Sequence, residues 1–309
     1  MVSYCYRSLR DATTARVDSV RKGAWAFVHE LAEEDIRHLI NTHGIDTGIL
    51  EDAVDYFEVP RFERVNEINY LFTRYPVNTK DGELSTAPLL IAITSDNVLT
   101  LTHRKAEFLD DIAHGRNPVV TTQKVRFVLH VMEAVIKQYS RSLMNIRREM
   151  LRYFGNLDQV TQKGIERFVG LESTVTDYTS ALGPTLTALR QMLSEKHVSL
   201  HEEDVDQIED LIQDITQLIE SGRNTAKTIV NIRNAQSTLL TNQLNNTIRQ
   251  LTALTIILTV PTIIASLFGM NTWLPGGNTP LAFFSVIFII GLSVGVVSWV
   301  FYKKRWFEN

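Results

Sequence analysis

The sequence has few cysteines and no excess of charge of one sign, and each lack excludes a class of protein. Its single cysteine, Cys5, excludes an intrachain disulfide, so we expect a reducing compartment. It also lacks an excess of charge of one sign, because 35 acidic residues stand against 31 Lys and Arg. The resulting net charge of −4 argues against a nucleic-acid partner. With 21% charged and 44% hydrophobic residues, the composition is that of a folded chain rather than a disordered one.

Charge is missing altogether from one long part of the chain. No Lys, Arg, Asp, Glu or His occurs in residues 250–302. A polar break with Gly and Pro, residues 269–280, divides this part into two apolar segments, 250–268 and 281–302. A bilayer core of about 30 Å needs roughly 20 helical residues. The sequence therefore predicts two membrane spans joined by an external loop; two buried helices of a large soluble core are the alternative.

The flanks of these segments predict the orientation in the membrane. Lys303, Lys304 and Arg305 follow the second segment, whereas the loop between the segments has no Lys or Arg. The positive-inside rule then places the C-terminus in the cytoplasm, and two spans return the N-terminus to the same side. The first residues contain no apolar region of the kind found in signal peptides. We expect a multi-pass protein of the cell membrane with both termini cytoplasmic.

The remainder of the chain predicts an α+β cytoplasmic domain over residues 1–120, followed by a stalk of long helices over residues 121–249 and the transmembrane domain over residues 250–309. The expected strands of the first part are residues 23–28, 69–75, 88–94 and 98–102. The last two of these flank Ser95-Asp96-Asn97, which suits a tight hairpin turn. The expected helices there are residues 33–42 and 45–56.

Three long helices are expected in the stalk. The first covers residues 122–153 and the second residues 157–193, with a kink or break at Gly183-Pro184. The third starts near Ser199, where Ser199 and Glu202 resemble a capping box. Because no Gly or Pro occurs from residue 223 to 260, this third helix is expected to continue into the first span. Such a helix of about 65 residues is about 100 Å long and suits a stalk rather than a compact monomer.

A heptad pattern occupies the start of the third helix. Its residues recur at alternating spacings of three and four: Val205, Ile208, Ile212, Ile215 and Ile219. This spacing indicates either an ordinary bundle helix or an oligomer seam, and the sequence does not separate the two.

A polar stripe continues along the same helix through the first span. Its positions are Thr238, Thr241, Asn245, Ile248, Thr252, Thr255, Thr259, Thr262 and Ser266. All but Ile248 carry a side-chain oxygen, and the spacing of three and four places them on one helix face. The hydroxyls could bond to their own helix or form tight helix contacts. Alternatively, they line a water-filled pore, which needs several chains because two helices cannot enclose one. No acid lies in the pore part of the stripe, so a strongly dehydrating site is not expected there.

The tripeptide Gly269-Met270-Asn271 directly follows the first span and resembles the characteristic motif of the CorA family of divalent-cation channels. Its placement strengthens the resemblance, since an α/β domain, a long helix, a second span and a basic C-terminal tail occur in the order of that family. Residues 44–60, with Leu50-Glu51-Asp52, also look like the N-terminal domain of the family. The resemblance covers nearly the whole chain.

The resemblance implies a funnel-shaped homopentamer that passes Mg²⁺, and often Co²⁺ or Ni²⁺, down its electrochemical gradient. It implies a selectivity filter of Gly269, Met270 and Asn271, where five amides of Asn271 bind a hydrated ion. Mg²⁺ loses its water reluctantly, which suits such a filter. Together with the polar stripe, the resemblance gives the expected pore-lining residues: Asn245, Ile248, Leu251, Thr252, Thr255, Thr259, Thr262 and Ser266. Ile248 and Leu251 match an apolar constriction, and at Thr259 the family usually has an apolar residue.

The resemblance also implies regulation by cytoplasmic Mg²⁺ bound between subunits. Asp52 and Asp210 match the carboxylate pair of the family that binds this ion. Bound Mg²⁺ would hold the subunits together and close the pore. The acidic residues near Asp210, between Glu202 and Glu209, could add ligands, or they could simply be a solvated helix start favoured by the helix dipole. Mg²⁺ is thus expected as substrate and regulatory ligand, and no cofactor is expected.

One departure from the family leaves the transported ion open. Many members carry acids in the loop after the motif, whereas residues 272–280 here contain none. A related branch moves Zn²⁺, so a CorA-like zinc transporter, with or without coupling to protons, is an alternative. A two-span anchor for a coiled-coil scaffold is a third hypothesis. An enzyme is not expected, because the sequence has no HExxH motif, no His/Cys cluster and no Walker A loop. The expected partners are the membrane, further copies of the chain and divalent cations.

Overall fold

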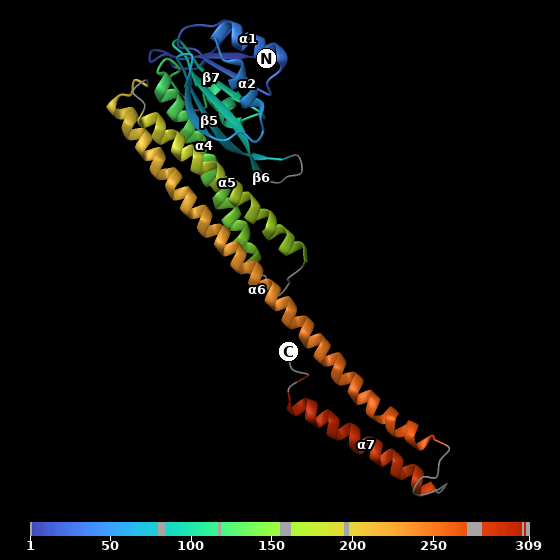
Figure 1. The fold of residues 1–309 in the computed structure, drawn as a ribbon. Helices are drawn as coiled ribbons and strands as arrows, with labels where there is room; N and C mark the ends of the chain where they lie inside the picture. The colour runs from blue at the N-terminus through green and yellow to red at the C-terminus, as the bar shows by residue number, and fades with distance from the viewer. Residues whose placement is uncertain are drawn as a thin grey trace. The chain divides into compact units, whose positions relative to one another are not determined.

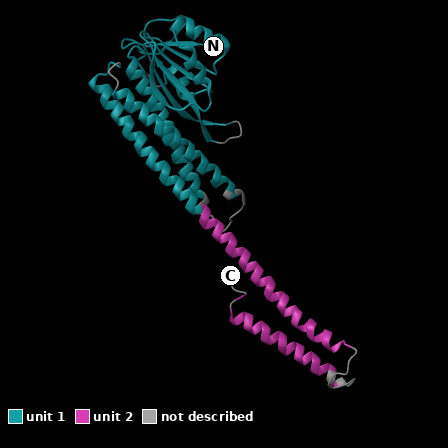
Figure 2. Ribbon diagram, viewed as in Figure 1, with its two compact units in different colours: residues 1–232 teal, residues 233–309 magenta. Residues whose placement is uncertain are grey.

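The computed structural model describes residues 2–79, 84–116, 119–154, 162–194, 198–270, 280–304 and 306. The chain divides into two compact units, residues 1–232 and 233–309, coloured teal and magenta in Figure 2. Helix α6, Glu202–Phe268, contributes residues to both. The three-part division with boundaries near residues 120 and 249 stays a prediction.

A seven-stranded sheet forms the centre of the first unit (Figure 1). Its strands are β1 (Ser3–Tyr6), β2 (Ala15–Val17), β3 (Trp25–His29), β4 (Arg61–Val65), β5 (Ile68–Asn78), β6 (Leu84–Ile93) and β7 (Val98–Thr102). They lie in the order β2-β1-β3-β7-β6-β5-β4, in which β3 and β7 are parallel and all other neighbours antiparallel. The four predicted strands are confirmed as β3, β5, β6 and β7.

The predicted hairpin between β6 and β7 is also confirmed. Ile93 pairs with Val98, and the Thr94 amide donates to the Asn97 carbonyl at 2.9 Å. The Asn97 side-chain amide donates in turn to the Ala24 carbonyl at 2.9 Å, which fixes the turn beside β3. Strands β1 and β2 were not predicted because they are short, and β4 was not predicted because three of its five residues are charged.

The two faces of the sheet carry separate apolar cores. Successive residues of a strand point to opposite faces, so on β5 Tyr70 and Phe72 join one core while Leu71 and Tyr75 join the other. Helices α1 (Glu33–His43) and α2 (Thr47–Val54) cover the first face. Helices α3 (Glu107–Ala113), α4 (Lys124–Phe154), α5 (Gln162–Ser194) and α6 contribute to the second core. Burial of each large apolar side chain stabilises the fold by about 1.5–3 kcal/mol.

The heptad positions of α6 pack inside the chain. Ile208 and Ile215 are fully buried, and Ile219 is nearly so, in the core that α4 and α5 share. This supports the bundle interpretation of the pattern. The predicted capping box is wrong: α6 starts at Glu202, where the His201 amide donates to Asp204 Oδ2 at 3.1 Å and Ser199 takes no part.

Of the kink or break predicted at Gly183-Pro184, the break is wrong, because α5 continues through it, and the kink stays a prediction. Pro184 cannot donate to the carbonyl four residues earlier. The neighbouring Leu182, Thr185 and Leu189 are nevertheless buried in the bundle, and this packing stabilises the helix across the proline. Tertiary contacts therefore override the local preference here.

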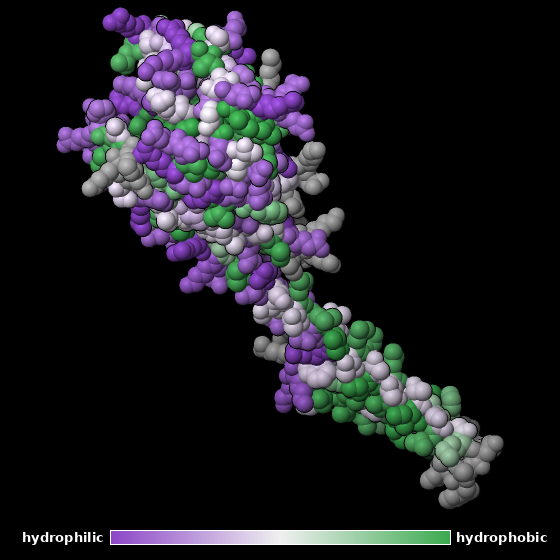
Figure 3. Space-filling model, turned by 45° about the horizontal axis from the view of Figure 1, so that its top comes forward, coloured by the Kyte–Doolittle hydropathy of each residue, from purple (hydrophilic) through white to green (hydrophobic). Residues whose placement is uncertain are grey.

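The second unit consists of the last part of α6 and α7 (Pro280–Lys303), which returns alongside it (Figure 1). Ala253 of α6 and Phe301 of α7 are buried, at 0% and 8% exposure. Most other large apolar side chains of this unit are exposed, and Figure 3 shows them as a green surface. Both helices contain segments long and apolar enough to cross a membrane, and α6 ends at Phe268 as predicted.

Candidate pore and cation-binding residues

The polar stripe forms one face of α6 in the second unit. From Ala253 onward, the less exposed residues of α6 are Ala253, Ile257, Val260, Pro261 and Ile264. The stripe residues Thr255, Thr259, Thr262 and Ser266 are all exposed. Before Ala253 nearly every side chain is exposed, so exposure does not single out Asn245, Ile248, Leu251 or Thr252 there. The isolated chain thus has an exposed hydroxyl face along the apolar part of α6.

The threonines of this face donate their hydroxyl protons to their own helix. Thr252, Thr255, Thr259 and Thr262 each bond to the carbonyl four residues earlier, at 2.7–2.9 Å. This confirms the back-bonding interpretation but does not remove the pore hypothesis. A hydroxyl oxygen that has donated its proton still has lone pairs free to accept. Such oxygens suit the water shell of a cation, because that water presents its hydrogens outward.

The expected selectivity filter begins at the C-terminal end of α6. The Gly269 amide donates to the Ala265 carbonyl at 2.9 Å, and the Met270 amide to the Leu267 carbonyl at 3.4 Å. The Met270 side chain is exposed. Asn271, on which the filter hypothesis depends most, lies outside the described residues, as does the rest of the loop to residue 279. The filter assignment therefore stays a prediction.

Asp52, the first expected ligand for regulatory Mg²⁺, lies in the last turn of α2. The helix begins at Thr47, where Asp46 Oδ1 accepts from the Gly48 amide at 2.9 Å. It ends at Val54, and the Asp52 carbonyl accepts from the Asp55 amide at 3.1 Å. Ile49, Leu50 and Ala53 face the core. Burial of these three residues leaves the carboxylate of Asp52 half-exposed at the edge of α2.

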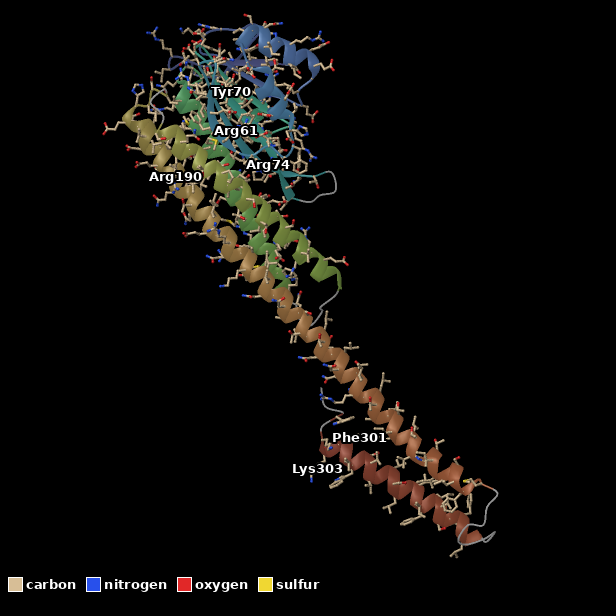
Figure 4. The ribbon with its side chains drawn as sticks, viewed as in Figure 1. Arg61, Tyr70, Arg74, Arg190, Phe301 and Lys303 are labelled. Carbon is tan, nitrogen blue, oxygen red and sulfur yellow. The ribbon has the colours of Figure 1, made fainter. Side chains whose placement is uncertain are left out.

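The Asp52 carboxylate is paired with an arginine that the sequence analysis did not single out. Arg61 Nη2 donates to Asp52 Oδ2 at 2.7 Å. The same guanidinium pairs with Glu58, and its Nε donates to Glu63 Oε1 at 2.9 Å. Burial lowers the pKa of Arg61, but the hydrogen bonds and charges of Glu63, Glu58 and Asp52 raise the pKa more, so its net shift is upward. Figure 4 shows Arg61 on its strand.

This arrangement was missed because β4 was not predicted. Residues 58–64 contain two acids and two arginines around Pro60, and Arg61 and Glu63 share one face of a strand. Pairing of β4 with β5, in which Arg61 lies opposite Phe72, places the cluster beside the end of α2. The cluster of charged residues was the available clue. The contact between Arg61 and Asp52 follows from it only once residues 61–65 are assigned to a strand.

Asp210, the second expected ligand, lies on an exposed side of α6. Within the described part of the chain it has no ion-pair partner and does not contact Asp52. No group of three or more His, Cys, Asp or Glu side chains among the described residues could hold a metal ion. Within one chain, neither Asp52 nor Asp210 belongs to a complete metal site among the described residues. Their regulatory role stays a prediction.

Comparisons with known proteins identify the family. The model of the family described as CorA-like Mg²⁺ transporter protein matches residues 21–305. The cobalt/magnesium transport protein CorA of Methanocaldococcus jannaschii is 25% identical over 295 residues, which cover 91% of this chain and 90% of that protein. The cobalt/magnesium transport protein CorA of Thermotoga maritima is 18% identical over 322 residues, with 99% and 91% covered.

The fold agrees with this assignment. The solved structure of the CorA magnesium transporter from M. jannaschii has a TM-score of 0.86 with 21% identity, covering 99% of this chain and 98% of that chain. Both share the α/β domain, the long helix and the C-terminal apolar helices. The match extends through α7, so it covers both compact units. On the family model and the fold together, this chain belongs to the CorA-like Mg²⁺ transporter family.

Proposed function

We propose that this protein is a homopentameric channel that passes Mg²⁺ across the cell membrane, with Co²⁺ and Ni²⁺ as further substrates. The names of the two CorA relatives, cobalt/magnesium transport proteins, support Mg²⁺ and Co²⁺, and Ni²⁺ is added from the resemblance to the family. The hydrated ion is selected at Gly269, Met270 and Asn271. Both termini lie in the cytoplasm, in keeping with the basic residues after α7.

The observation that carries the proposal is the exposed hydroxyl face of α6. The threonine hydroxyls of this face have donated their protons to their own helix, and their remaining lone pairs can accept a further hydrogen bond from water but not from lipid. Two helices cannot enclose water, whereas five copies of α6 around one axis can. The hydroxyl oxygens of Thr255, Thr259, Thr262 and Ser266 then accept hydrogen bonds from the water shell of the ion. Ile248 and Leu251 form an apolar constriction that closes by excluding water.

Cytoplasmic Mg²⁺ closes this channel in the proposed mechanism. Asp52 of one subunit and Asp210 of its neighbour each supply a carboxylate, and the ion joins the two subunits. Two carboxylates bind Mg²⁺ weakly, because the ion keeps most of its water. Weak binding suits a sensor of millimolar metal. Loss of the ion frees the subunits to move and opens the constriction.

Ion flux into proteoliposomes tests the proposal. We expect Mg²⁺ uptake that does not depend on a pH gradient, and Asn271→Ala should abolish it while the oligomer stays intact by size-exclusion chromatography. Asn278→Ala, in the same loop but outside the motif, is the matched control and should retain uptake.

Three other outcomes would change the assignment. Zn²⁺ uptake that follows a pH gradient would move the protein to the zinc-transporting branch with the same fold. Absence of any flux from correctly inserted protein would favour the membrane-anchor hypothesis. Unchanged Mg²⁺ uptake by Asn271→Ala would remove the filter assignment alone.

A further inference from the structure

The cluster around Arg61 brings three carboxylates to one guanidinium. Asp52 comes from α2, Glu58 from the segment before β4, and Glu63 from β4 itself. Three acids against one arginine leave a net charge of −2 at this point of the surface. Arg61 contacts all three carboxylates, but one positive charge cannot neutralise three negative charges, so the cluster attracts further cations.

Arg61 itself is firmly held, and Asp52 is its loosest partner. The guanidinium carbon lies 4.0 Å from the centre of the Phe72 ring, a cation–π contact that fixes it against β5. The Glu58 side chain is 15% exposed and Glu63 32%, whereas Asp52 is 46% exposed. An ion pair loses strength as its members become exposed to water. Of the three contacts, that to Asp52 is therefore the easiest to break.

We propose that Arg61 is a built-in competitor for the cation at Asp52, and that it sets the Mg²⁺ concentration at which the regulatory site fills. The inference rests on the proposed regulatory role of Asp52. In the absence of Mg²⁺ the guanidinium occupies the carboxylate. When Mg²⁺ binds, Asp52 turns toward the ion, while Arg61 keeps Glu58 and Glu63 as partners. The exchange leaves no buried charge without a partner, which keeps its cost small.

Mg²⁺-dependent protection against protease measures this competition without relying on transport. The full-length protein in detergent is digested at increasing MgCl₂ and constant ionic strength, and the midpoint of protection is recorded. Arg61→Gln should lower this midpoint about threefold to fivefold, the size expected for loss of one partly exposed ion pair. Arg64→Gln removes the same charge three residues away, from an exposed position, and is the matched control.

A second pair of variants predicts a shift in the opposite direction. Glu63→Gln removes one partner of Arg61, so the guanidinium holds Asp52 more strongly and the midpoint should rise. Glu51→Gln, which removes an exposed acid next to Asp52 in the sequence, controls for general loss of negative charge. If Arg61→Gln does not fold, as judged by circular dichroism, the Glu63→Gln comparison decides the question alone.

The outcomes separate this inference from the function on which it rests. Equal midpoints for Arg61→Gln and Arg64→Gln, or for Glu63→Gln and Glu51→Gln, would overturn the competition. Asp52→Asn should raise the midpoint in the wild-type background, and adding Arg61→Gln to it should then have no further effect. If Asp52→Asn leaves the midpoint unchanged, the regulatory role of Asp52 fails; if it raises the midpoint while Arg61→Gln has no effect, only the competition fails.

Discussion

The first unit, residues 1–232, buries its large apolar side chains, whereas the second unit, residues 233–309, exposes most of them. In the first unit, large side chains such as Trp25, Tyr70 and Leu71 are fully buried between the sheet and its helices. In the second unit, Leu258, Phe288 and Trp299 are 61%, 70% and 61% exposed. A soluble protein rarely leaves so large an apolar surface open. The difference indicates that the apolar surface of the second unit meets the membrane instead of water.

Polar groups differ between the two units in a related way. In the first unit, several buried polar side chains have partners from distant parts of the chain, as when Trp25 Nε1 donates to Thr100 Oγ1 at 2.9 Å, although helical threonines such as Thr185 and Thr225 bond to their own helix there too. In the second unit, the described hydroxyls bond mainly to the carbonyl one turn earlier in their own helix. Such local bonds need no tertiary structure. The polar face of α6 is therefore available for interactions beyond the single chain.

The largest effect is expected when a charge is placed on the exposed apolar surface of α7. Ile289 lies near the middle of α7 and is 45% exposed. An arginine there costs about 3 kcal/mol in a membrane relative to isoleucine. Ile289→Arg should sharply reduce the protein recovered in the membrane fraction after carbonate extraction.

The matched control lies in the first unit. Leu9 is 75% exposed, and its sequence neighbours Ser8, Arg10 and Asp11 are polar or charged. Leu9→Arg should leave membrane recovery and thermal stability unchanged, because an exposed apolar residue facing water contributes little. Equal membrane recovery of Ile289→Arg and Leu9→Arg would mean that this side of α7 also faces water, and it would contradict the difference between the two units.

A smaller effect is expected from the same glycine substitution in the two units. A Cβ on Gly222 of α6 would lie 2.6 Å from Thr179 Cγ2 of α5. Thr179 is stiff because it is β-branched and its hydroxyl bonds to the Thr176 carbonyl. Gly222→Ala should therefore lower the free energy of unfolding by about 1–3 kcal/mol. Chemical denaturation followed by circular dichroism measures the change.

Two open glycines serve as controls for this clash. Gly183 of α5 and Gly295 of α7 have nothing within 4 Å of an added Cβ in the single chain. Gly183→Ala should stabilise its helix by up to about 1 kcal/mol through higher helix propensity. Gly295→Ala should be harmless to the fold of the chain. Destabilisation by Gly183→Ala would show that backbone strain, and not the contact with Thr179, explains the loss at Gly222.

The elements that depend on a local pattern were the ones predictable from the sequence. The uncharged residues 250–302 predicted both apolar helices, and the missing Gly and Pro predicted the continuity of α6. Strand β4 was missed because RFERV carries charge at three of five positions, and its place in the sheet depends on pairing with β5. Because β4 was not predicted, the ion-pair cluster around Arg61 was not predicted either. Asp52 could be named from the resemblance, but its partner follows only from the fold.

The smallest effect concerns the two faces of α6 within the second unit. Thr262 belongs to the exposed hydroxyl face and bonds to the Leu258 carbonyl at 2.8 Å, whereas Thr247 lies off the stripe and bonds to the Gln243 carbonyl at 3.0 Å. Valine keeps the shape of threonine but removes the hydroxyl, so both substitutions lose the same local bond. If the hydroxyl face lines the pore, Thr262→Val also removes an acceptor for the water shell of the ion. A net hydrogen bond of about 1 kcal/mol then corresponds to about fivefold slower Mg²⁺ uptake.

Thr247→Val should leave uptake in proteoliposomes at the wild-type rate, because the helix keeps its other backbone bonds and no acceptor is lost from the pore. Equal rates for the two variants would mean that the threonines serve their own helix alone, and the polar face of α6 would then belong to helix contacts and not to a water-filled pore.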